Sequence, residues 1–532
     1  MKENFRQFLD RLRQAGELVD LHQAVDIRHI ATLVDQASTA LLFHNVIGYE
    51  MPVVSGIIRS KERATMAMGC ENFGEIEHKL AAAIAKPIPP KYVNGSPTRE
   101  VIMTGDEVDL FKLPIPMSSI YDGGPMITAG VVICKDPELG FNSGIYRFIV
   151  KEKALTGIDI VTPNNMRLFA QRALERNEPL PISISIGVHP FEITGSGFRA
   201  PLGVDEMGIA GGLRGEAVEL SPCSTIDVPY IADAEIVLEA EILPTGWTWP
   251  EGRFGEFTRL MGGLHWNPLV RIKAISMRKD AIYYNLHMPW ENTWLAAPTR
   301  YTAIRQALKV ANVQVSDINV TLGGCAFWHA VISIKKGAAG DGKNALLAAL
   351  SVMDLKHVVV VDDDIDLNNP TDVEWAIATR VQGDKDVIVI PGARAKPLDP
   401  SLLQGAGVVP IGAKVGIDAT IPEHIPKEHY ERITYAYADT AKVADYVKGK
   451  KDAVGKHGAE RDVEELGQKI LAAIEKEPLY YTDIAERFSD YDFNTVARAL
   501  GHLHQTEKLW QDPKGKMCVR GSRFAAVMPV KK

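Results

Sequence analysis

The sequence has few cysteines and no long apolar run, and each absence excludes a class of protein. Its five cysteines are scattered over 532 residues without a Cys-x-x-Cys pair, so neither a disulfide framework nor a zinc site is predicted. No apolar run approaches the roughly 20 residues that cross a bilayer. The N-terminus lacks the apolar core of a signal peptide. We therefore expect a cytoplasmic protein without a membrane partner.

The chain also lacks an excess of basic residues. Its formal net charge is −8, which gives no reason to expect nucleic acid or an anionic membrane as a partner. Hydrophobic residues at 46% and charged residues at 24% are ordinary for a globular protein. At 532 residues the chain is too long for one core, so several domains are predicted.

Changes in pattern divide the chain into five segments. Helices and short strands are mixed in the first segment, and short β-branched runs broken by Gly and Pro fill the second, which predicts a β-barrel or sandwich. In the third, strands alternate with helices, as in an α/β layer. A charged linker then leads to a compact module. The expected boundaries are 1–110, 111–300, 301–446, 447–458 and 459–532.

The last segment has the pattern of a winged helix. Three predicted helices precede two strand-like pieces; their ranges are 462–476, 481–488, 493–505, 508–511 and 517–520. A DNA reader needs a basic footprint, but from residue 459 onwards 12 Lys and Arg are balanced by 12 Asp and Glu. We therefore favour protein contact or subunit packing over DNA binding.

An acidic run follows a buried strand in the α/β segment. It consists of Asp362, Asp363, Asp364 and Asp366. Such carboxylates could hold magnesium, but the following Asn369-Pro-Thr-Asp is a helix-start signal, so we favour a polar strand end. The strand, the helix 371–381 and a second strand at 386–390 indicate a βαβ-like unit.

The stretch Trp249-Pro-Glu-Gly-Arg-Phe-Gly-Glu-Phe257 holds two carboxylates, Glu251 and Glu256, five positions apart. Neither a straight strand nor a helix would aim both at one target. The proline and the two glycines indicate a bend that can turn both into one pocket. Paired carboxylates in unlike surroundings suit acid–base catalysis near neutral pH. Taken alone, the stretch is more typical of a solvated hairpin with two surface glutamates.

Three further motifs carry polar residues. Gly140-Phe-Asn-Ser-Gly-Ile-Tyr-Arg147 contains Asn142 and Arg147. An Arg near carboxylates can hold a substrate carboxylate through two hydrogen bonds, although a lone Arg is more often a structural ion-pair partner. Glu206 precedes a Gly-rich turn, and Lys414 stands among glycines in a setting that suits a phosphate.

In combination, these motifs resemble the UbiD family of prenylated-flavin-dependent decarboxylases. They are Asn-x-x-x-x-Arg (142–147), Asp-Glu-Met…Ala-Gly-Gly-Leu-Arg-Gly (205–215), Ala-Glu-Ile-Val-Leu-Glu (234–239), Pro-Glu-Gly-x-Phe-Gly-Glu (250–256) and Lys-x-Gly-Ile-Asp-Ala-Thr (414–420). The resemblance spans roughly residues 1 to 445. It implies a multidomain α+β and α/β fold, with a central split β-barrel like that of flavin reductases between α/β domains. The winged-helix-like module is an addition.

The resemblance also implies a catalytic triad. By motif position Arg147 would hold the leaving carboxylate, Glu251 would orient the Arg, and Glu256 would protonate the carbon left behind. Loss of CO₂ needs an electron sink that no side chain here readily provides, so a cofactor is expected. In the family this cofactor is prenylated FMN, supplied by a flavin prenyltransferase.

Cofactor-binding residues follow from the same resemblance. Family members hold the flavin phosphate through a divalent metal, usually Mn²⁺, with K⁺ nearby. Asn142 and Glu206 match two metal ligands, Ser196 the K⁺ contact and Lys414 the phosphate-binding Lys, and Ile145 and Tyr146 stand beside Arg147 in the cofactor-binding motif.

One departure from the family concerns the metal. The usual third ligand is a His, but no His occurs from Lys151 to Val188. Asn164 or Asn165 could offer a carbonyl oxygen, and water could complete the shell of a hard cation. Without an imidazole ligand, the site would bind Mn²⁺ less strongly relative to Mg²⁺.

Several aromatic residues stay ambiguous at this point. His265, His287 and His329 fall in segments that line the pocket in the family, but each is more typical of a packed or solvent-exposed His. Trp290, Trp294 and Trp328 could shape an aromatic-acid pocket or belong to the core.

The predicted activity is the reversible decarboxylation of an aromatic or α,β-unsaturated acid, or of a CoA thioester such as phthaloyl-CoA, in a homo-oligomer (dimer or hexamer). Two rival functions remain: a ligand-sensing DNA-binding regulator, suggested by the tail, and an assembly subunit of a multi-protein carboxylase.

Overall fold

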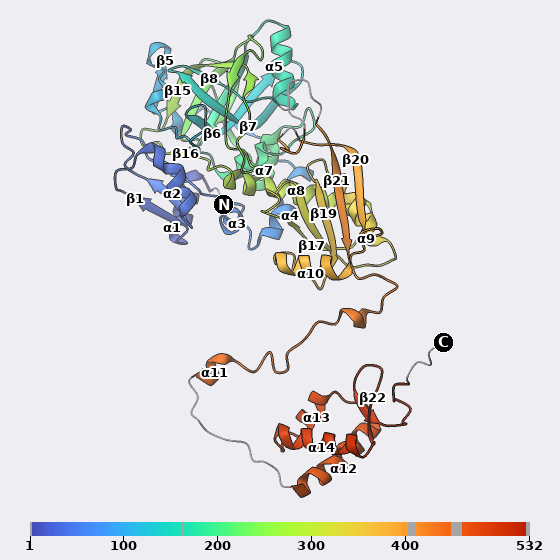
Figure 1. The fold of residues 1–532 in the computed structure, drawn as a ribbon. Coiled ribbons are helices and arrows are strands. Elements are labelled where there is room, and N and C mark those ends of the chain that lie inside the picture. The colour runs from blue at the N-terminus through green and yellow to red at the C-terminus, as the bar shows by residue number, and fades with distance from the viewer. Residues whose placement is uncertain (1–2, 162, 397, 403–409, 448–459, 528–532) are drawn as a thin grey trace. The chain divides into compact units, whose positions relative to one another are not determined.

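The computed structural model describes residues 3–161, 163–396, 398–402, 410–447 and 460–527 (Figure 1). Residues 1–425 form one compact unit and residues 426–532 a second. Within the described ranges, the helices are too short or too polar to cross a membrane.

The N-terminal part is a small sheet with helices around it. Its strands lie in the order β1-β2-β3-β16, and its elements are α1 (Phe5–Gln14), β1 (Leu18–Leu21), α2 (Ile30–Gln36), β2 (Ala40–Phe43), β3 (Val53–Ser55), α3 (Lys61–Ala67), α4 (Phe73–Ala85) and β16 (Tyr283–Asn285). Asn4 starts α1 with a capping box to Gln7. The helix ends at Gln14, and Leu18 begins β1.

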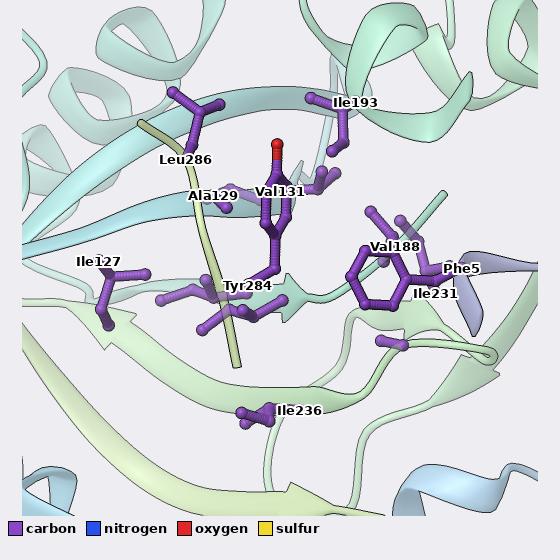
Figure 2. Packing of buried hydrophobic residues seen from close by; sticks show 14 of the residues in the cluster. Phe5, Ile127, Ala129, Val131, Val188, Ile193, Ile231, Ile236, Tyr284 and Leu286 are labelled. Atoms are coloured by element: carbon purple, nitrogen blue, oxygen red, sulfur yellow. The ribbon is translucent and has the colours of Figure 1, made fainter. Parts of the chain in front are cut away.

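The central part is a closed antiparallel barrel of six strands, as the β-rich pattern predicts. The order β12-β9-β6-β7-β8-β15 closes because β15 also pairs with β12. The strands are β6 (Met126–Asp136), β7 (Gly140–Glu152), β8 (Leu155–Gly157), β9 (Leu180–Ile186), β12 (Ile236–Ile242) and β15 (Leu269–Met277). Aliphatic side chains from β6 and β12 meet Tyr284 and Leu286 in one buried cluster (Figure 2).

Shorter elements surround the barrel. They are β4 (Lys91–Tyr92), β5 (Val101–Thr104), α5 (Asn165–Glu175), α6 (Pro190–Ser196), α7 (Glu206–Arg214), β10 (Glu219–Pro222), β11 (Pro229–Ile231), β13 (Trp249–Glu251) and β14 (His265–Asn267). Helices α6 and α7 pack closely because Gly195 has no side chain: a Cβ there would lie 2.7 Å from the Cβ of Ala210.

The α/β part is a five-stranded sheet in the order β17-β18-β19-β21-β20. It comprises α8 (Trp290–Val310), β17 (Val315–Val320), β18 (His329–Ile334), α9 (Asp341–Leu350), β19 (His357–Asp362), α10 (Pro370–Arg380), β20 (Val387–Arg394) and β21 (Ile411–Ala419). The prediction of a βαβ-like unit around α10 is wrong in its pairing. Strand β21 inserts between β19 and β20, and β20 runs antiparallel to it. The parallel unit is β18–α9–β19.

The acidic run of this sheet serves structure. Asn369 caps α10, as predicted, by accepting a hydrogen bond from Thr371 N–H. Asp362 and Asp364 form ion pairs with Arg380, whose side chain is fully buried. The described residues contain no group of three His, Cys, Asp or Glu that could hold a metal.

The second unit contains α11 (Val443–Val447), α12 (Glu460–Lys476), α13 (Tyr481–Arg487), α14 (Phe493–Gln505), β22 (Leu509–Gln511) and β23 (Met517–Val519). The last three helices pack around Leu466, Ile470 and Leu500. The order of three helices and a hairpin is the predicted one, and membership of the winged-helix class stays a prediction. The expected linker, 447–458, lies almost entirely outside the described residues.

Candidate active site

The two glutamates lie on a hairpin that leaves the barrel. Strands β13 and β14 pair with Glu251 opposite His265, and the intervening loop folds back through bonds from Gly262 N–H to Phe254 O and from Glu256 N–H to Leu260 O. Glu251 and Glu256 are only 2% and 7% exposed. The predicted bend is confirmed, and the interpretation as a solvated hairpin is wrong.

Arg147 on β7 is held between two carboxylates. Its NH1 lies 2.6 Å from Glu256 Oε1, and its NH2 lies 2.5 Å from Asp159 Oδ2. Burial by itself would lower the pKa of Arg147, but the charges of Asp159, Glu256 and Glu251 outweigh burial and raise it. The guanidinium therefore stays charged at any pH at which the protein is folded.

Glu251 is the carboxylate without a partner. Both of its oxygens are buried, and neither has a hydrogen-bond partner among the residues that the structure describes. Burial, reinforced by the charge of Asp159, raises the pKa of Glu251 to about 7. Its carboxyl group packs against Gly157, where a Cβ would overlap it. Glu251 therefore carries a proton for much of the time near neutral pH.

This geometry differs from the expected roles in one respect. The family resemblance implies that Glu251 orients Arg147, whereas the ion pairs of Arg147 in the structure go to Glu256 and Asp159. Asp159 was not singled out in the sequence. It stands 12 positions after Arg147, in no motif, and only the course of the chain after β8 brings it to the guanidinium.

Glu206 meets Ser143 where β7 borders α7, and the Nδ2 of Asn142 lies 3.9 Å from the Sγ of Cys134. The carboxylate of Glu206 accepts a hydrogen bond from the backbone N–H of Ser143 at 2.9 Å, and Asn142 is the adjacent residue. Burial raises the pKa of Glu206 to about 7. The hydroxyl oxygens of Ser143 and of Ser196, at the end of α6, are buried without a partner in the described part of the chain. Such orphaned polar atoms fit a site that receives a polar ligand.

The same strand carries Ile145 and Tyr146. The ring of Tyr146 lies over Gly144, where a Cβ would contact it, and Ile145 packs towards Gly197 beyond the end of α6. Both residues therefore lie on the stretch of β7 between Asn142 and Arg147, beside Ser196.

The two asparagines proposed in place of the missing His have local roles. Asn164 caps α5 by accepting a hydrogen bond from Arg167 N–H at 2.8 Å. Asn165 donates its side-chain N–H to Ala200 O at 3.3 Å. Asn164 therefore uses its carbonyl oxygen for the helix, and Asn165 is the better remaining candidate for a third ligand.

Lys414 lies against a helix end. Its Nζ donates to Leu350 O at 2.7 Å and Val352 O at 2.8 Å, at the C-terminus of α9. Positive charge is favourable at this end of a helix. Lys414 also lines a small pocket together with Asp354 and Lys396.

Beside Lys414 lies a cationic cluster that sequence reasoning missed. Arg300 and Lys396 share the carboxylate of Asp354, at 3.0 and 3.3 Å, and both cations lie over the ring of Phe327. Burial, together with the charge of Arg300, lowers the pKa of Lys396 to about 7. Two cations paired with one carboxylate leave a net positive charge, which favours the binding of an anion. The only sequence signal was the Lys of Ala395-Lys-Pro-Leu-Asp.

The aromatic residues that the sequence left ambiguous have different surroundings in the structure. His287 is 4% exposed, its ring nitrogens have no hydrogen-bond partner among the described residues, and burial lowers its pKa to about 4. It is therefore a buried neutral imidazole. Trp294 packs on Phe73, as part of the core. Trp328 contacts Phe257, next to Glu256.

Three family models match the chain in succession. They describe the N-terminal domain (residues 9–82), the Rift-related domain (91–289) and the C-terminal domain (293–419) of 3-octaprenyl-4-hydroxybenzoate carboxy-lyase, UbiD. The chain belongs to the UbiD family. Arg147, Glu251 and Glu256 all fall in the Rift-related match, and Lys396 and Lys414 fall in the C-terminal one.

Relatives of this UbiD chain are named as decarboxylases. The anhydromevalonate phosphate decarboxylase of Methanothermobacter thermautotrophicus is 35% identical over 420 residues, which cover 78% of this chain and 96% of the relative. The structure of the UbiD-class enzyme HmfF from Pelotomaculum thermopropionicum with FMN is 38% identical, with a TM-score of 0.78, and covers 84% of this chain and 100% of that chain.

An evolved dimeric form of HmfF with prFMN is 36% identical, with a TM-score of 0.75, and covers 83% of this chain and 99% of that chain. The family and its named members make this chain a carboxy-lyase. These UbiD relatives include flavin complexes.

Proposed function

We propose that this UbiD enzyme reversibly decarboxylates an acid whose carboxyl group is conjugated to an aromatic ring or a carbon–carbon double bond, with prenylated FMN as cofactor. The observation that carries the proposal is Arg147, buried between carboxylates on the hairpin side and the β8 side, with the unpaired Glu251 beside it. A buried arginine with an exchangeable carboxylate partner is a receptor for another carboxylate.

The residues around β7 fit the cofactor. Asn142 and Glu206 would hold the divalent metal, Mn²⁺ or Mg²⁺, with Asn165 or water as a third ligand, and Ser196 would contact K⁺. Ile145 and Tyr146 would line the cofactor. The buried hydroxyl groups of Ser143 and Ser196, without partners in the described ranges, support a ligand here. When bound, prenylated FMN supplies the electron sink for CO₂ loss.

The phosphate of the cofactor needs cations, and two sets are available. Lys414 is the residue that the family motif indicates, but its Nζ is occupied by two carbonyl oxygens. Arg300 and Lys396 share a single carboxylate. We therefore propose that Arg300 and Lys396 neutralise the phosphate, with Lys414 supporting the same pocket.

Catalysis by the protein would proceed by exchange at Arg147. The substrate carboxylate displaces Glu256 from NH1 and is oriented by the guanidinium, which aligns the bond to be broken. Glu256, released from its ion pair as a carboxylate, would take up the proton that Glu251 holds at neutral pH and give it to the carbon that lost CO₂. Glu251 would then regain a proton from solvent.

The substrate class is kept broad. The named relative acts on anhydromevalonate phosphate, and the family is named for an aromatic acid. A CoA thioester such as phthaloyl-CoA remains a proposal. We also propose a homo-oligomer that receives its cofactor from a flavin prenyltransferase.

The test uses enzyme co-produced with a flavin prenyltransferase. CO₂ release is measured for free aromatic acids, a phosphorylated unsaturated acid and phthaloyl-CoA, and the bound cofactor is identified by mass. Glu256→Gln should retain the cofactor and lose about 100-fold or more in kcat, the usual contribution of a general acid. Absence of a flavin mass, or full activity of Glu256→Gln, would contradict the proposal.

A further inference from the structure

Asp159 is attached to Arg147 twice. Its backbone N–H donates to the carbonyl oxygen of Arg147 at 3.3 Å, and its Oδ2 lies 2.5 Å from NH2 of the same residue. The backbone bond arises because the chain beyond β8 runs along the edge of β7. Asp159 is therefore brought to the guanidinium by strand geometry.

The other oxygen of Asp159 faces His265. The Oδ1 lies 3.7 Å from Nδ1 of His265, too far for a hydrogen bond but close enough for ionic attraction. Asp159 raises the pKa of His265. His265 is the residue opposite Glu251 in the β13–β14 pair. Asp159 thus reaches both Arg147 and β14, the strand that pairs with the one carrying Glu251.

The charged groups around Glu251 come from every neighbouring segment. Arg147 and Lys151 face it from β7, Asp159 from the chain after β8, and His265 from β14. Glu256, on the same hairpin, shares the charge of Arg147. In this set the cations favour the ionised form of Glu251, and Asp159 opposes them.

We propose that Asp159 is a positioning residue of this active site, which fixes the Arg147 guanidinium for the substrate carboxylate and keeps the proton on Glu251. The proposal rests on the proposed decarboxylase function for its kinetic consequences. Asp159 neutralises the part of the Arg147 charge that would otherwise ionise Glu251. Without Asp159, Arg147 would favour the ionised form of Glu251 more strongly, while burial would still oppose ionisation.

A purely structural role makes a different prediction, and the barrel offers a matched control. Glu235 is a fully buried carboxylate that pairs with Arg6 at 2.8 Å and Arg278 at 3.4 Å. It also accepts the backbone N–H of Ile282. None of these partners belongs to the active site. Glu235→Gln therefore removes a comparable buried ion pair and should leave the acid–base groups unchanged.

The first experiment measures kcat/KM against pH for cofactor-loaded wild type, Asp159→Asn, His265→Gln and Glu235→Gln. For Asp159→Asn we expect the fall of kcat/KM at high pH to begin about one pH unit lower than in wild type. At pH values above that fall, kcat/KM should be about tenfold lower than in wild type. His265→Gln removes a charge that favours ionised Glu251, so its fall should begin at higher pH. Glu235→Gln should not move the fall, and Asp159→Glu should restore the wild-type profile.

The second experiment needs neither cofactor nor turnover. The carboxyl carbon of Glu251 is titrated by NMR in unloaded, ¹³C-glutamate-labelled protein, and its signal is assigned by its loss in Glu251→Gln. The Glu251 titration should shift to lower pH in Asp159→Asn and to higher pH in His265→Gln. If Asp159→Asn does not fold, the His265→Gln and Asp159→Glu arms still decide.

The proposal is overturned if Asp159→Asn and Glu235→Gln lower the melting temperature equally while the pKa of Glu251 in Asp159→Asn stays at its wild-type value. It is also overturned if the Asp159 and His265 variants shift that pKa in the same direction. A loaded wild type that decarboxylates no acid contradicts the proposed function instead, because the NMR titration does not depend on it.

Discussion

Arg147 and Arg380 each pair with two carboxylates, yet only Arg147 belongs to the candidate active site. Arg380 pairs with Asp362 at 3.3 Å and Asp364 at 2.5 Å. Arg147 pairs with Glu256 at 2.6 Å and Asp159 at 2.5 Å. Their residue types and distances are nearly the same, so pair geometry alone does not separate structure from function.

The surroundings of the two pairs differ. At Arg380, Asp362 also accepts the backbone N–H of Ile421, and the Asp364 side chain is 40% exposed. At Arg147, a third carboxyl group, Glu251, stays buried without a partner among the described residues. Burying an unpaired ionisable group costs stability. A protein tolerates that cost where the group has a chemical task.

The largest effect should come from removing each arginine in turn. Arg147→Met should lower kcat/KM by about 1,000-fold, comparable to the loss of an electrostatic transition-state contact. Arg380→Met should lower the free energy of unfolding by about 3–5 kcal/mol, the usual cost of breaking a buried pair, without changing kcat per folded molecule. Steady-state kinetics and thermal unfolding of both variants test the contrast. Equal losses of kcat per folded molecule in the two variants would contradict this contrast between Arg147 and Arg380.

Glu251→Gln should sharpen the contrast through pH. Because folding raises the pKa of Glu251 from its usual 4.5 to about 7, the folded state binds this proton more tightly. That stabilisation is complete below pH 4.5 and is lost as the pH rises to about 7. The variant should therefore match wild type at low pH and exceed it by up to about 3 kcal/mol at pH 8. Urea unfolding at both pH values measures this, and parallel pH curves would contradict it.

Gly157→Ala should act on the same group by contact. The new Cβ would overlap the Glu251 carboxyl group, whereas a Cβ at Gly263, in the same hairpin, meets nothing within 4 Å. Because the end of a side chain can move aside, we expect little change in melting temperature and about a tenfold loss of kcat/KM, or about 1.4 kcal/mol. Gly263→Ala is the control. Equal activities of the two variants would show that the position of Glu251 does not matter.

The smallest effect is expected at Lys414. Its two hydrogen bonds to the end of α9 should make Lys414→Met about 1–2 kcal/mol less stable. Flavin affinity should fall less in this variant than in Lys396→Met. Fluorescence titration with FMN compares them. A greater loss of FMN affinity in Lys414→Met would indicate that Lys414, the residue that the family motif indicates, binds the phosphate.

The sequence alone was sufficient for much of this protein. The sequence pattern placed α14 at its observed bounds, because the signals for a helix are local. The prolines and glycines around Glu251 predicted the bend, and the ordered motifs predicted the UbiD family. What the sequence placed wrongly was pairing: β21 inserts between β19 and β20, and no local signal specifies which strand becomes a neighbour.

The same limit applies to the site. The resemblance to the family implied that an arginine and two glutamates would meet, whereas the local Pro and Gly residues predicted only the bend between the glutamates. Only the tertiary structure decided which carboxylate pairs with Arg147. That choice depends on the edge of β7, along which the chain beyond β8 runs and delivers Asp159. Glu251 is left to hold a proton because charge and burial act through space and not along the chain.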